Sequence, residues 1–307
     1  MEQRPNERRP GLSTCHGHSQ NASSIQAALD AAAPGTIVTI PAGRYIVREP
    51  LIVRKNNITI FARRGAVLDC LNASKPLNST KPALIVRADS FKRPTMCPEG
   101  PKQQFPLKNF TLRGTLQVRN ASETAIYIFG VDGFRVSGTS VIDAGKHALA
   151  SECSKNGAFR NNYARQGIGI MVMGSQRVNV TRNRIENHSQ GGVFHADHDY
   201  GLHFVDIKDD PALINKAATN TTITNNRFSN NGYAPVNCCS MWSHDLYNDF
   251  VDFALWGKGT CFSGNSYTSA AVMYPPDFPE QARFMPDVQH YRASEFDSFQ
   301  SYATACK

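Results

Sequence analysis

The sequence lacks several features that would assign the chain to a familiar class at once. It has no apolar run of about 18 residues, the length that a membrane-spanning helix needs. Its cysteines include no Cys-x-x-Cys pair, which argues against a zinc ribbon or a redox motif. Residues 1–17 have no apolar core and do not form a signal peptide, so we expect a secreted form to have lost its signal.

The charge balance is basic but contains no dense basic tract. There are 33 Lys and Arg against 25 Asp and Glu, a net charge of +8. Such a balance favours an acidic partner, and the absence of any run of about five basic residues argues against nucleic acid. We therefore expect an anionic polysaccharide as partner and a monomeric protein. The alternative is a protein that is merely basic.

The eight cysteines are spread along the chain, and their even number suits disulfides and an oxidising, extracellular compartment. The alternative is a set of buried reduced thiols. Possible N-glycan acceptors are also frequent. Asn-x-Ser/Thr triplets begin at Asn21, Asn57, Asn72, Asn78, Asn109, Asn120, Asn179, Asn187 and Asn220.

Residues 23–35 predict a helix and the residues after them predict strands. Ser23 and Gln26 have the spacing of a capping box, apolar residues at 25, 28, 29 and 32 share one helical face, and Pro34-Gly35 ends the helix. Two β-branched runs, "TIVTI" and "RYIV", follow on either side of a turn at 41–43.

Short β-rich runs then recur with Asn and Gly turns between them. Equivalent runs end at Ile60, Leu112, Val136, Val180 and Ile223, with gaps close to one or two multiples of 22 to 26 residues. The segments 181–187, 224–230 and 263–269 are similar, and they place Asn183, Asn226 and Asn265 at matching turns, where Asn tolerates a left-handed backbone. A repeat of this length predicts stacked coils that share one core.

The segment "SIQAALDAAAPGTIVTIPAGRYIV" resembles the N-terminal cap and first coil of pectin-lyase-like proteins, and "GKGTCFSGNSYTSA" resembles the closing coils of β-helix repeat proteins. The resemblance implies an all-β fold, a right-handed parallel β-helix (solenoid) with an N-terminal capping α-helix that shields a strand edge. We expect a disordered lead-in at 1–18, the β-helix at 19–270 and a packed tail at 271–307.

Three segments, 125–132, 167–174 and 191–198, align as strands of successive coils. An offset of 24 between the last two places His195 beside Met171 and near Phe129, with Tyr127 and Asp197 on the same outer face. His198, Asp199, Tyr200 and His203 follow at its edge. An exposed aromatic and apolar strip favours a contact surface. The alternative is that residues 198–218 cover the strip.

The strip predicts a set of substrate-binding residues and a set of catalytic residues. The substrate-binding set is Tyr127, Phe129, Met171 and His203. The catalytic set is His195, Asp197, His198, Asp199, Tyr200 and Arg165. Arg165, like Arg160, leads toward this sheet and supplies positive charge, although an arginine in a solvent-facing turn is the commoner case.

In the family, lyases and epimerases that act on uronic-acid polysaccharides begin by removing the C5 proton, which needs a cation, a base and an acid. "ADHD" (196–199) is similar to the Asp-Pro-His-Asp signature of mannuronan C5-epimerases; His198 and Asp199 match it, whereas Ala196 and Asp197 do not. Ca²⁺ is a possible cofactor. Hydrolase motifs are missing apart from Asp209-Asp210, so we expect a lyase or epimerase. The alternatives are a β-helix that only binds glycans and a His/Asp cluster that only binds metal.

Overall fold

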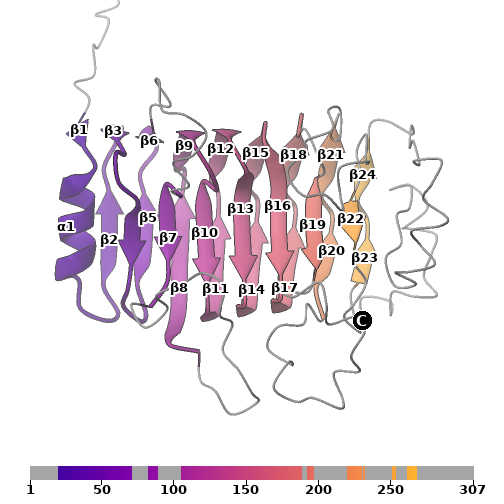
Figure 1. The fold of residues 1–307 in the computed structure, drawn as a ribbon, viewed down its shortest axis with the longest axis horizontal. Coiled ribbons are helices and arrows are strands. Elements are labelled where there is room, and N and C mark those ends of the chain that lie inside the picture. Colours follow the sequence, from indigo (N-terminus) through magenta and orange to yellow (C-terminus); the bar gives the residue numbers. More distant parts are fainter. Residues whose placement is uncertain are drawn as a thin grey trace, which may run out of the picture.

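A computed structural model describes residues 20–70, 82–88, 105–188, 192–196, 220–229, 231, 251–253 and 261–267. Its strands all pair in parallel and coil along one long axis, with the helix at one end (Figure 1). Within this part of the chain no helix is long and apolar enough to cross a membrane. The strands form three sheets, named A, B and C.

Each sheet takes one strand from every coil, so that neighbouring strands of a sheet come from successive coils. In spatial order, sheet A contains β1 (Gln20–Asn21), β3 (Gly43–Ile46), β6 (Ala66–Asp69), β9 (Gln117–Ala121), β12 (Ser140–Ala144), β15 (Tyr163–Arg165), β18 (Arg184–Glu186), β21 (Arg227–Ser229) and β24 (Ser266–Tyr267). Sheet B contains β2 (Ile37–Ile40), β5 (Thr59–Ala62), β8 (Leu107–Gly114), β11 (Val131–Ser137), β14 (Lys155–Arg160), β17 (Gln176–Thr181), β20 (Thr222–Thr224) and β23 (Cys261–Ser263). Sheet C contains β4 (Leu51–Val53), β7 (Leu84–Val86), β10 (Ile126–Phe129), β13 (His147–Glu152), β16 (Ile168–Met173), β19 (Val193–Ala196) and β22 (Val251–Phe253).

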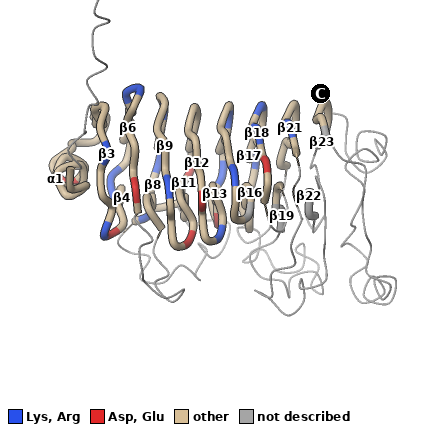
Figure 2. Tube along the Cα trace, turned by 90° about the horizontal axis from the view of Figure 1, so that it is seen from above, with Lys and Arg blue, Asp and Glu red and all other residues tan. Residues whose placement is uncertain are grey.

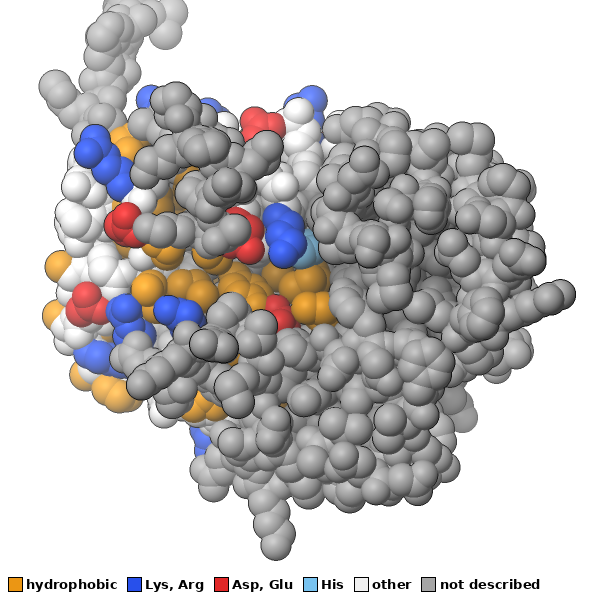
Figure 3. Space-filling view, viewed as in Figure 1, with side chains coloured by type: hydrophobic (Ala, Val, Ile, Leu, Met, Phe, Trp, Pro, Cys, Tyr) orange, Lys and Arg blue, Asp and Glu red, His pale blue; other side chains and the backbone are white. Residues whose placement is uncertain are grey.

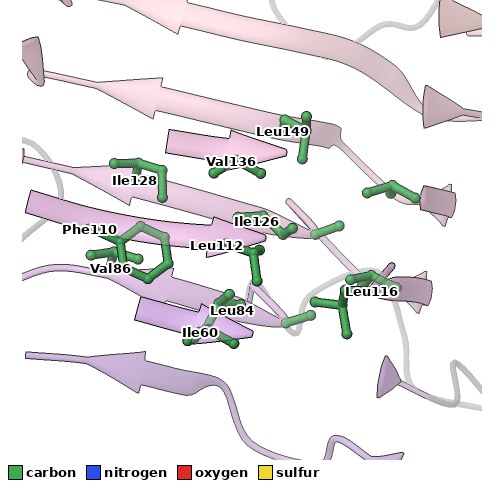
Figure 4. Packing of buried hydrophobic residues seen from close by; sticks show 14 of the residues in the cluster. Ile60, Leu84, Val86, Phe110, Leu112, Leu116, Ile126, Ile128, Val136 and Leu149 are labelled. Atoms are coloured by element: carbon green, nitrogen blue, oxygen red, sulfur yellow. The ribbon is translucent and has the colours of Figure 1, made fainter. Parts of the chain in front are cut away.

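The chain passes from sheet B to A to C and back to B, so that each coil lies on the one before it (Figure 2). Every second residue points inward, and the inward side chains of all coils form one apolar core (Figure 4). No coil buries this surface alone, so the stack stabilises itself through contacts between neighbouring coils.

The predicted repeat is confirmed, but its spacing was partly misread. Val136 and Val180 are two coils apart, because Phe159 pairs with both of them. Ile60 pairs directly with Leu112, however, and Val180 directly with Ile223. The gaps of 52 and 43 residues are therefore single coils with long insertions.

The helix α1 (Ser23–Ala31) covers the end of the solenoid. Ile25 and Leu29 are buried, but Ala28 is exposed. The predicted capping box is wrong, because Ala22 is the N-cap and makes no side-chain cap. Gln26 instead accepts a hydrogen bond from the Ile52 N–H at 2.7 Å and donates one to the Ile52 carbonyl at 3.1 Å. Through Gln26 the helix thus binds the backbone of β4, the edge strand of sheet C, and this protects that edge from pairing with another chain.

A ladder of buried asparagines joins the turns between sheets B and A. The side-chain oxygen of Asn183 accepts from the N–H of Asn162 at 3.0 Å, and that of Asn226 accepts from the N–H of Asn183 at 2.9 Å. Asn265 continues the ladder at 2.9 Å from Asn226. The ladder was predicted, but the left-handed residue is the preceding one: Arg182, Asn225 and Gly264 have φ of 56°, 54° and 63°.

Candidate functional site

The outer face of sheet C carries three of the predicted site residues. Tyr127 pairs with Ala150, and Ala150 pairs with Met171. Phe129 lies two residues beyond Tyr127 on the same strand. Ile126 and Ile128, which alternate with them, point into the core. Tyr127, Phe129 and Met171 therefore share one face, as predicted.

His195 does not lie beside Met171. In β19, Val193 pairs with Ile170 and is buried in the core, Phe194 pairs with Met171, and His195 pairs with Val172. The prediction used an offset of 24 residues where the strands have 23, and a shift of one residue exchanges the two faces of a strand. The predicted neighbours of His195 are therefore wrong.

The remaining predicted residues fall elsewhere. Arg165 ends β15 in sheet A, where it pairs with Ile142 and Glu186, and it is exposed. Arg160 ends β14 in sheet B. Neither lies on the sheet C face. Residues Asp197, His198, Asp199, Tyr200 and His203 lie outside the described residues, so their roles stay predictions.

The strip on sheet C is covered at the positions that were expected to contact a ligand. Phe129 is 0% exposed and Met171 is 5% exposed, although both point away from the core. Phe129 forms a second apolar cluster with Cys153, and the Tyr127 ring packs against it at 5.9 Å between centroids. Phe129 and Met171 are therefore covered; residues 198–218 lie outside the described residues, so the alternative that they form the cover stays a prediction.

Only two cysteine side chains belong to the described part of the chain, and they differ. Cys153 is disulfide-bonded, whereas Cys70 is free and partly buried. Burial, together with the neighbouring Asp69 carboxylate, raises the pKa of the Cys70 thiol to about 12. Cys70 is therefore a protonated, unreactive thiol at neutral pH.

A charged cluster surrounds Tyr127 on this face. The Tyr127 hydroxyl donates a hydrogen bond to the carboxylate of Glu152, which pairs with Phe129 in the strand register. Glu123 lies in the turn before β10, and Lys146 lies in the equivalent turn before β13. The two turns are joined by a hydrogen bond from the Lys146 N–H to the Glu123 carbonyl at 3.1 Å, and Lys146 Nζ is 3.9 Å from Glu123 Oε1.

The exposure of the side chains in this cluster falls from its rim inward. Lys146 and Glu123 have side chains that are 51% and 24% exposed, whereas Glu152 is buried. In the space-filling view of this face, apolar side chains gather over β7, β10, β13 and β16, and acidic and basic side chains lie among them (Figure 3). A ligand would meet Lys146 and Glu123 first and the Tyr127–Glu152 pair beneath them.

Burial and neighbouring charges set the protonation of this cluster. Burial raises the pKa of Glu123, Lys146 lowers it, and Glu152 raises it again. Burial, followed by the Glu152 carboxylate, raises the pKa of Tyr127 far above its usual value, against the opposing charge of Arg87. Tyr127 is therefore a neutral hydrogen-bond donor at physiological pH. Glu123 is the carboxyl group of this cluster whose pKa shifts toward neutral pH, which is the direction that a general acid or base requires.

His147 begins β13 beside this cluster. Its Nδ1 lies 3.4 Å from the Thr124 hydroxyl. Burial and the neighbouring Lys146 lower the pKa of His147 to about 3, so the imidazole is neutral. Among the described residues, no group of three or more His, Cys, Asp or Glu side chains is arranged to hold a metal ion.

Sequence reasoning missed Glu123, Lys146 and Glu152. Glu123-Thr124-Ala125 and Lys146-His147-Ala148 are aligned copies of one corner, 23 residues apart, and that repeat was the available signal. Glu152 was overlooked because β13 was left out of the three-strand alignment, although it lies between β10 and β16.

Comparison with solved structures shows similar folds at low sequence identity. A Geobacillus virus E2 protein, ORF18, is 13% identical with a TM-score of 0.55, over 81% of this chain and 45% of that one. The family 28 exopolygalacturonase of Yersinia enterocolitica is 12% identical with a TM-score of 0.48, over 81% of this chain and 53% of that one. The DFA-IIIase of Arthrobacter chlorophenolicus A6 is 12% identical with a TM-score of 0.47, over 81% of this chain and 66% of that one. The chain thus covers less than two thirds of each of these proteins.

Comparison by sequence gives a family but no individual relative. No curated protein sequence matches the chain. The family model "right handed beta helix region" matches residues 107–266, which span β8 to β24. This match covers more than half of the 307 residues and agrees with the observed order of strands and with the predicted fold class. The chain belongs to the right-handed β-helix family.

Proposed function

We propose that the outer face of sheet C processes an anionic, uronic-acid polysaccharide by acid–base chemistry at C5, as a lyase or an epimerase does. The observation that carries this proposal is the set of two carboxylates and two cations around the neutral phenol of Tyr127. An extracellular location, where such polysaccharides occur and disulfides persist, is part of the proposal.

The proposed roles follow from the exposure and charge of each group. Lys146 at the rim, and Arg87 near Tyr127, hold the C6 carboxylate of the sugar, which makes the C5 proton more acidic. Glu123 exchanges that proton, because its pKa is raised toward neutrality. Tyr127 keeps Glu152 in place, because its hydroxyl donates its one hydrogen bond to that carboxylate.

In a lyase the C5 carbanion expels the O4 substituent, whereas in an epimerase a proton returns to the opposite face of C5. His198 and Asp199, which match the epimerase signature in part, stay predicted members of the same site. So does a Ca²⁺ ion, as an alternative source of positive charge.

A second function, hydrolysis, is favoured by one observation. Glu123 and Glu152 act on the same tyrosine, and burial raises the pKa of Glu123. A carboxyl of raised pKa beside a second carboxyl group is the arrangement that glycoside hydrolases use.

The test is a panel of alginate, polygalacturonate and a neutral glucan incubated with the purified chain. A lyase gives unsaturated ends that absorb in the ultraviolet, an epimerase changes the C5 signals in NMR without chain cleavage, and a hydrolase gives new reducing ends without absorbance. Glu123→Gln should lower the rate about 100-fold or more.

Glu186→Gln is the matched control, because Glu186 also accepts a hydrogen bond from a tyrosine but lies on sheet A. It should leave the rate within about 2-fold, since substitutions away from a site have small effects. Wild-type turnover in Glu123→Gln would remove Glu123 from the mechanism. Retention on an acidic polysaccharide without any product would replace catalysis by binding alone.

A further inference from the structure

Sheet B presents an outer face of a different kind. Among the described residues, the large apolar side chains that are exposed are Ile37 at 54% and Phe61 at 36%. Both lie on the outer face of sheet B, on the adjacent strands β2 and β5. Phe61 pairs with Thr39, two residues beyond Ile37, so the exposed ring and the exposed aliphatic side chain are diagonal neighbours on one face, which indicates a contact surface rather than scattered surface residues.

Three exposed arginines continue this surface along the solenoid. Arg113 pairs with Phe61, and its guanidinium lies 5.5 Å from the centre of the Phe61 ring. Arg135 follows on β11 and Arg160 on β14. Neighbouring strands are about 4.8 Å apart, so the three positions lie on consecutive strands within about 10 Å.

The neighbours of these arginines are uncharged. Arg135 pairs with Thr111 and Ala158, and Arg160 pairs with Ser137 and Thr181. None of the three arginines forms an ion pair with a carboxylate of the described residues. The acidic residue of β11, Asp132, is already 3.4 Å from Lys155. The guanidinium groups are therefore available to an external anion, flanked by the hydroxyls of Thr111 and Thr181, which can donate further hydrogen bonds.

We infer that the outer face of sheet B is a second, non-catalytic site that binds a carboxylate-bearing polysaccharide chain. The arginines bind successive sugar carboxylates, because the guanidinium fork matches a carboxylate in a bidentate fashion. The Phe61 ring packs against the C–H face of a sugar. The choice of a uronate as the acidic sugar rests on the proposed function, whereas the arrangement of the face does not.

A polysaccharide fits this face better than a single-stranded nucleic acid. Proteins that bind single strands stack successive bases on several aromatic rings. Across the described residues, Phe61 is the one exposed aromatic ring among the large apolar side chains of this face. One ring followed by three arginines on consecutive strands, with Arg135 offset by two residues from Arg113 and Arg160, matches a chain that carries a charge on every sugar.

The test compares two triple variants that remove the same charge from different faces. Arg113→Gln/Arg135→Gln/Arg160→Gln alters sheet B, and Arg64→Gln/Arg119→Gln/Arg227→Gln alters exposed arginines in a turn and on sheet A. Binding to polygalacturonate chains of about ten sugars is measured by calorimetry at low and at physiological salt. The sheet B triple should bind about tenfold more weakly or worse, and the control within about twofold of wild type.

Phe61→Ala supplies a second variant that leaves the charge unchanged. It should weaken binding about threefold at both salt concentrations, because its contribution is not electrostatic. Product formation from a short oligosaccharide should be normal in all three variants, which separates this site from sheet C. If no product forms with any substrate, the proposed function fails while the binding result still stands.

Three results would overturn the inference. Equal loss of affinity in both triples would mean that net charge alone attracts the polymer. Unchanged affinity in the sheet B triple would mean that this face is only solvated. Tighter binding of a single-stranded oligonucleotide than of polygalacturonate, lost in the sheet B triple, would make the face a nucleic-acid site.

Discussion

Two tyrosine–glutamate pairs stand on two faces of the same solenoid. In sheet C, Tyr127 donates its hydroxyl proton to Glu152 in the next coil. In sheet A, Tyr163 donates to Glu186 in the next coil, at 2.9 Å. The tyrosine and its glutamate are 25 residues apart in the first pair and 23 in the second.

Their surroundings differ. Tyr127 packs beside the buried Phe129 and Cys153 and beneath the charges of Glu123 and Lys146. Tyr163 lies at the surface, where the Arg184 guanidinium is 5.4 Å from the centre of its ring and also binds Glu186. Burial raises the pKa of both hydroxyls, followed in each case by the glutamate.

The comparison separates two contributions to each pair: the stacking of successive coils, and the shielding of the side chains from water. The coil stacks a glutamate over a tyrosine on either face. Both glutamates are buried, but burial raises the pKa of Tyr127 far more than that of Tyr163, so the phenol on sheet C is the one held away from water, where a charge interacts more strongly with its neighbours. We therefore expect function on sheet C and a solvated ion-pair network on sheet A.

The largest effect should come from breaking the frame that both faces share. Asn183→Ala removes the amide that accepts from the Asn162 N–H at 3.0 Å and donates to the Phe159 carbonyl at 3.0 Å. It also removes one of the two donors to the Asn226 side-chain oxygen, at 3.0 Å, while the Asn183 N–H remains as the other. Leaving these buried groups without partners should cost about 3–5 kcal/mol, measured as a fall in the urea midpoint of unfolding.

Asn179→Ala is the control for the asparagine ladder. Asn179 is exposed on β17, and its loss should change the free energy of unfolding by less than about 0.5 kcal/mol. If both variants unfold at the same urea concentration, the buried ladder is not what holds the coils together.

The next effect compares the two tyrosines directly. Tyr127→Phe deletes a hydrogen bond to a buried carboxylate and should cost about 1.5–3 kcal/mol. Tyr163→Phe deletes the same kind of bond to Glu186, which is also buried but keeps the exposed Arg184 as a charged partner, and should cost less than about 1 kcal/mol. Urea unfolding measures the loss in free energy of unfolding for each variant. Equal losses would show that the Tyr127 hydrogen bond is no better shielded from water than that of Tyr163.

The fold could be predicted because its signal is repeated. The inward residues at Leu112, Val136, Val180 and Ile223 alternate with polar ones in every coil, and one error in spacing does not change the pattern. The asparagine ladder was predicted for the same reason. Insertions of any length can leave a coil unchanged, so the gaps of 52 and 43 residues were misread as two coils.

The site was predictable only in part, because it depends on the exact register of individual strand pairs and on the burial of individual side chains. The β19 segment begins after Gly191-Gly192, and its sequence does not distinguish offsets of 23 and 24 residues. Tyr127 and Phe129 were placed correctly because the apolar alternation of β10 is unambiguous. Their burial depends on residues distant in sequence, which strand alternation does not reveal.

A smaller effect should appear in the pH dependence of stability. Burial lowers the pKa of His147 on sheet C to about 3 and that of His188, after β18 of sheet A, to about 4. Backbone groups of Ala164 and Gly167 oppose the shift at His188 without cancelling it. Unfolded histidine has a pKa of about 6.5, so the unfolded chain binds more protons below that pH.

Stability therefore falls as the pH falls from about 6.5 toward the folded pKa values. Each histidine should contribute a loss of about 1 kcal/mol between pH 6.5 and 5.5. His188→Gln and His147→Gln should each flatten the pH profile of the urea midpoint relative to wild type. Profiles parallel to that of wild type would show that these imidazoles already bind a proton in the folded chain.

The smallest effect should come from the surface pair of sheet A. Arg184→Gln removes an exposed guanidinium that binds Glu186 and covers the Tyr163 ring. The arginine end of this pair is exposed and screened by salt, and the buried Glu186 keeps the Tyr163 hydroxyl as a donor, so the net contribution of Arg184 is small. The thermal midpoint of Arg184→Gln should equal that of wild type at physiological salt.

Lys146→Gln is the counterpart of this variant on sheet C. It removes a partner of the partly buried Glu123, and the pKa of Glu123 should then rise further. That rise should move the acidic limb of the pH–rate profile upward, a shift that Arg184→Gln should not produce. An equal shift in both variants would mean that sheet C is no better shielded from solvent than sheet A.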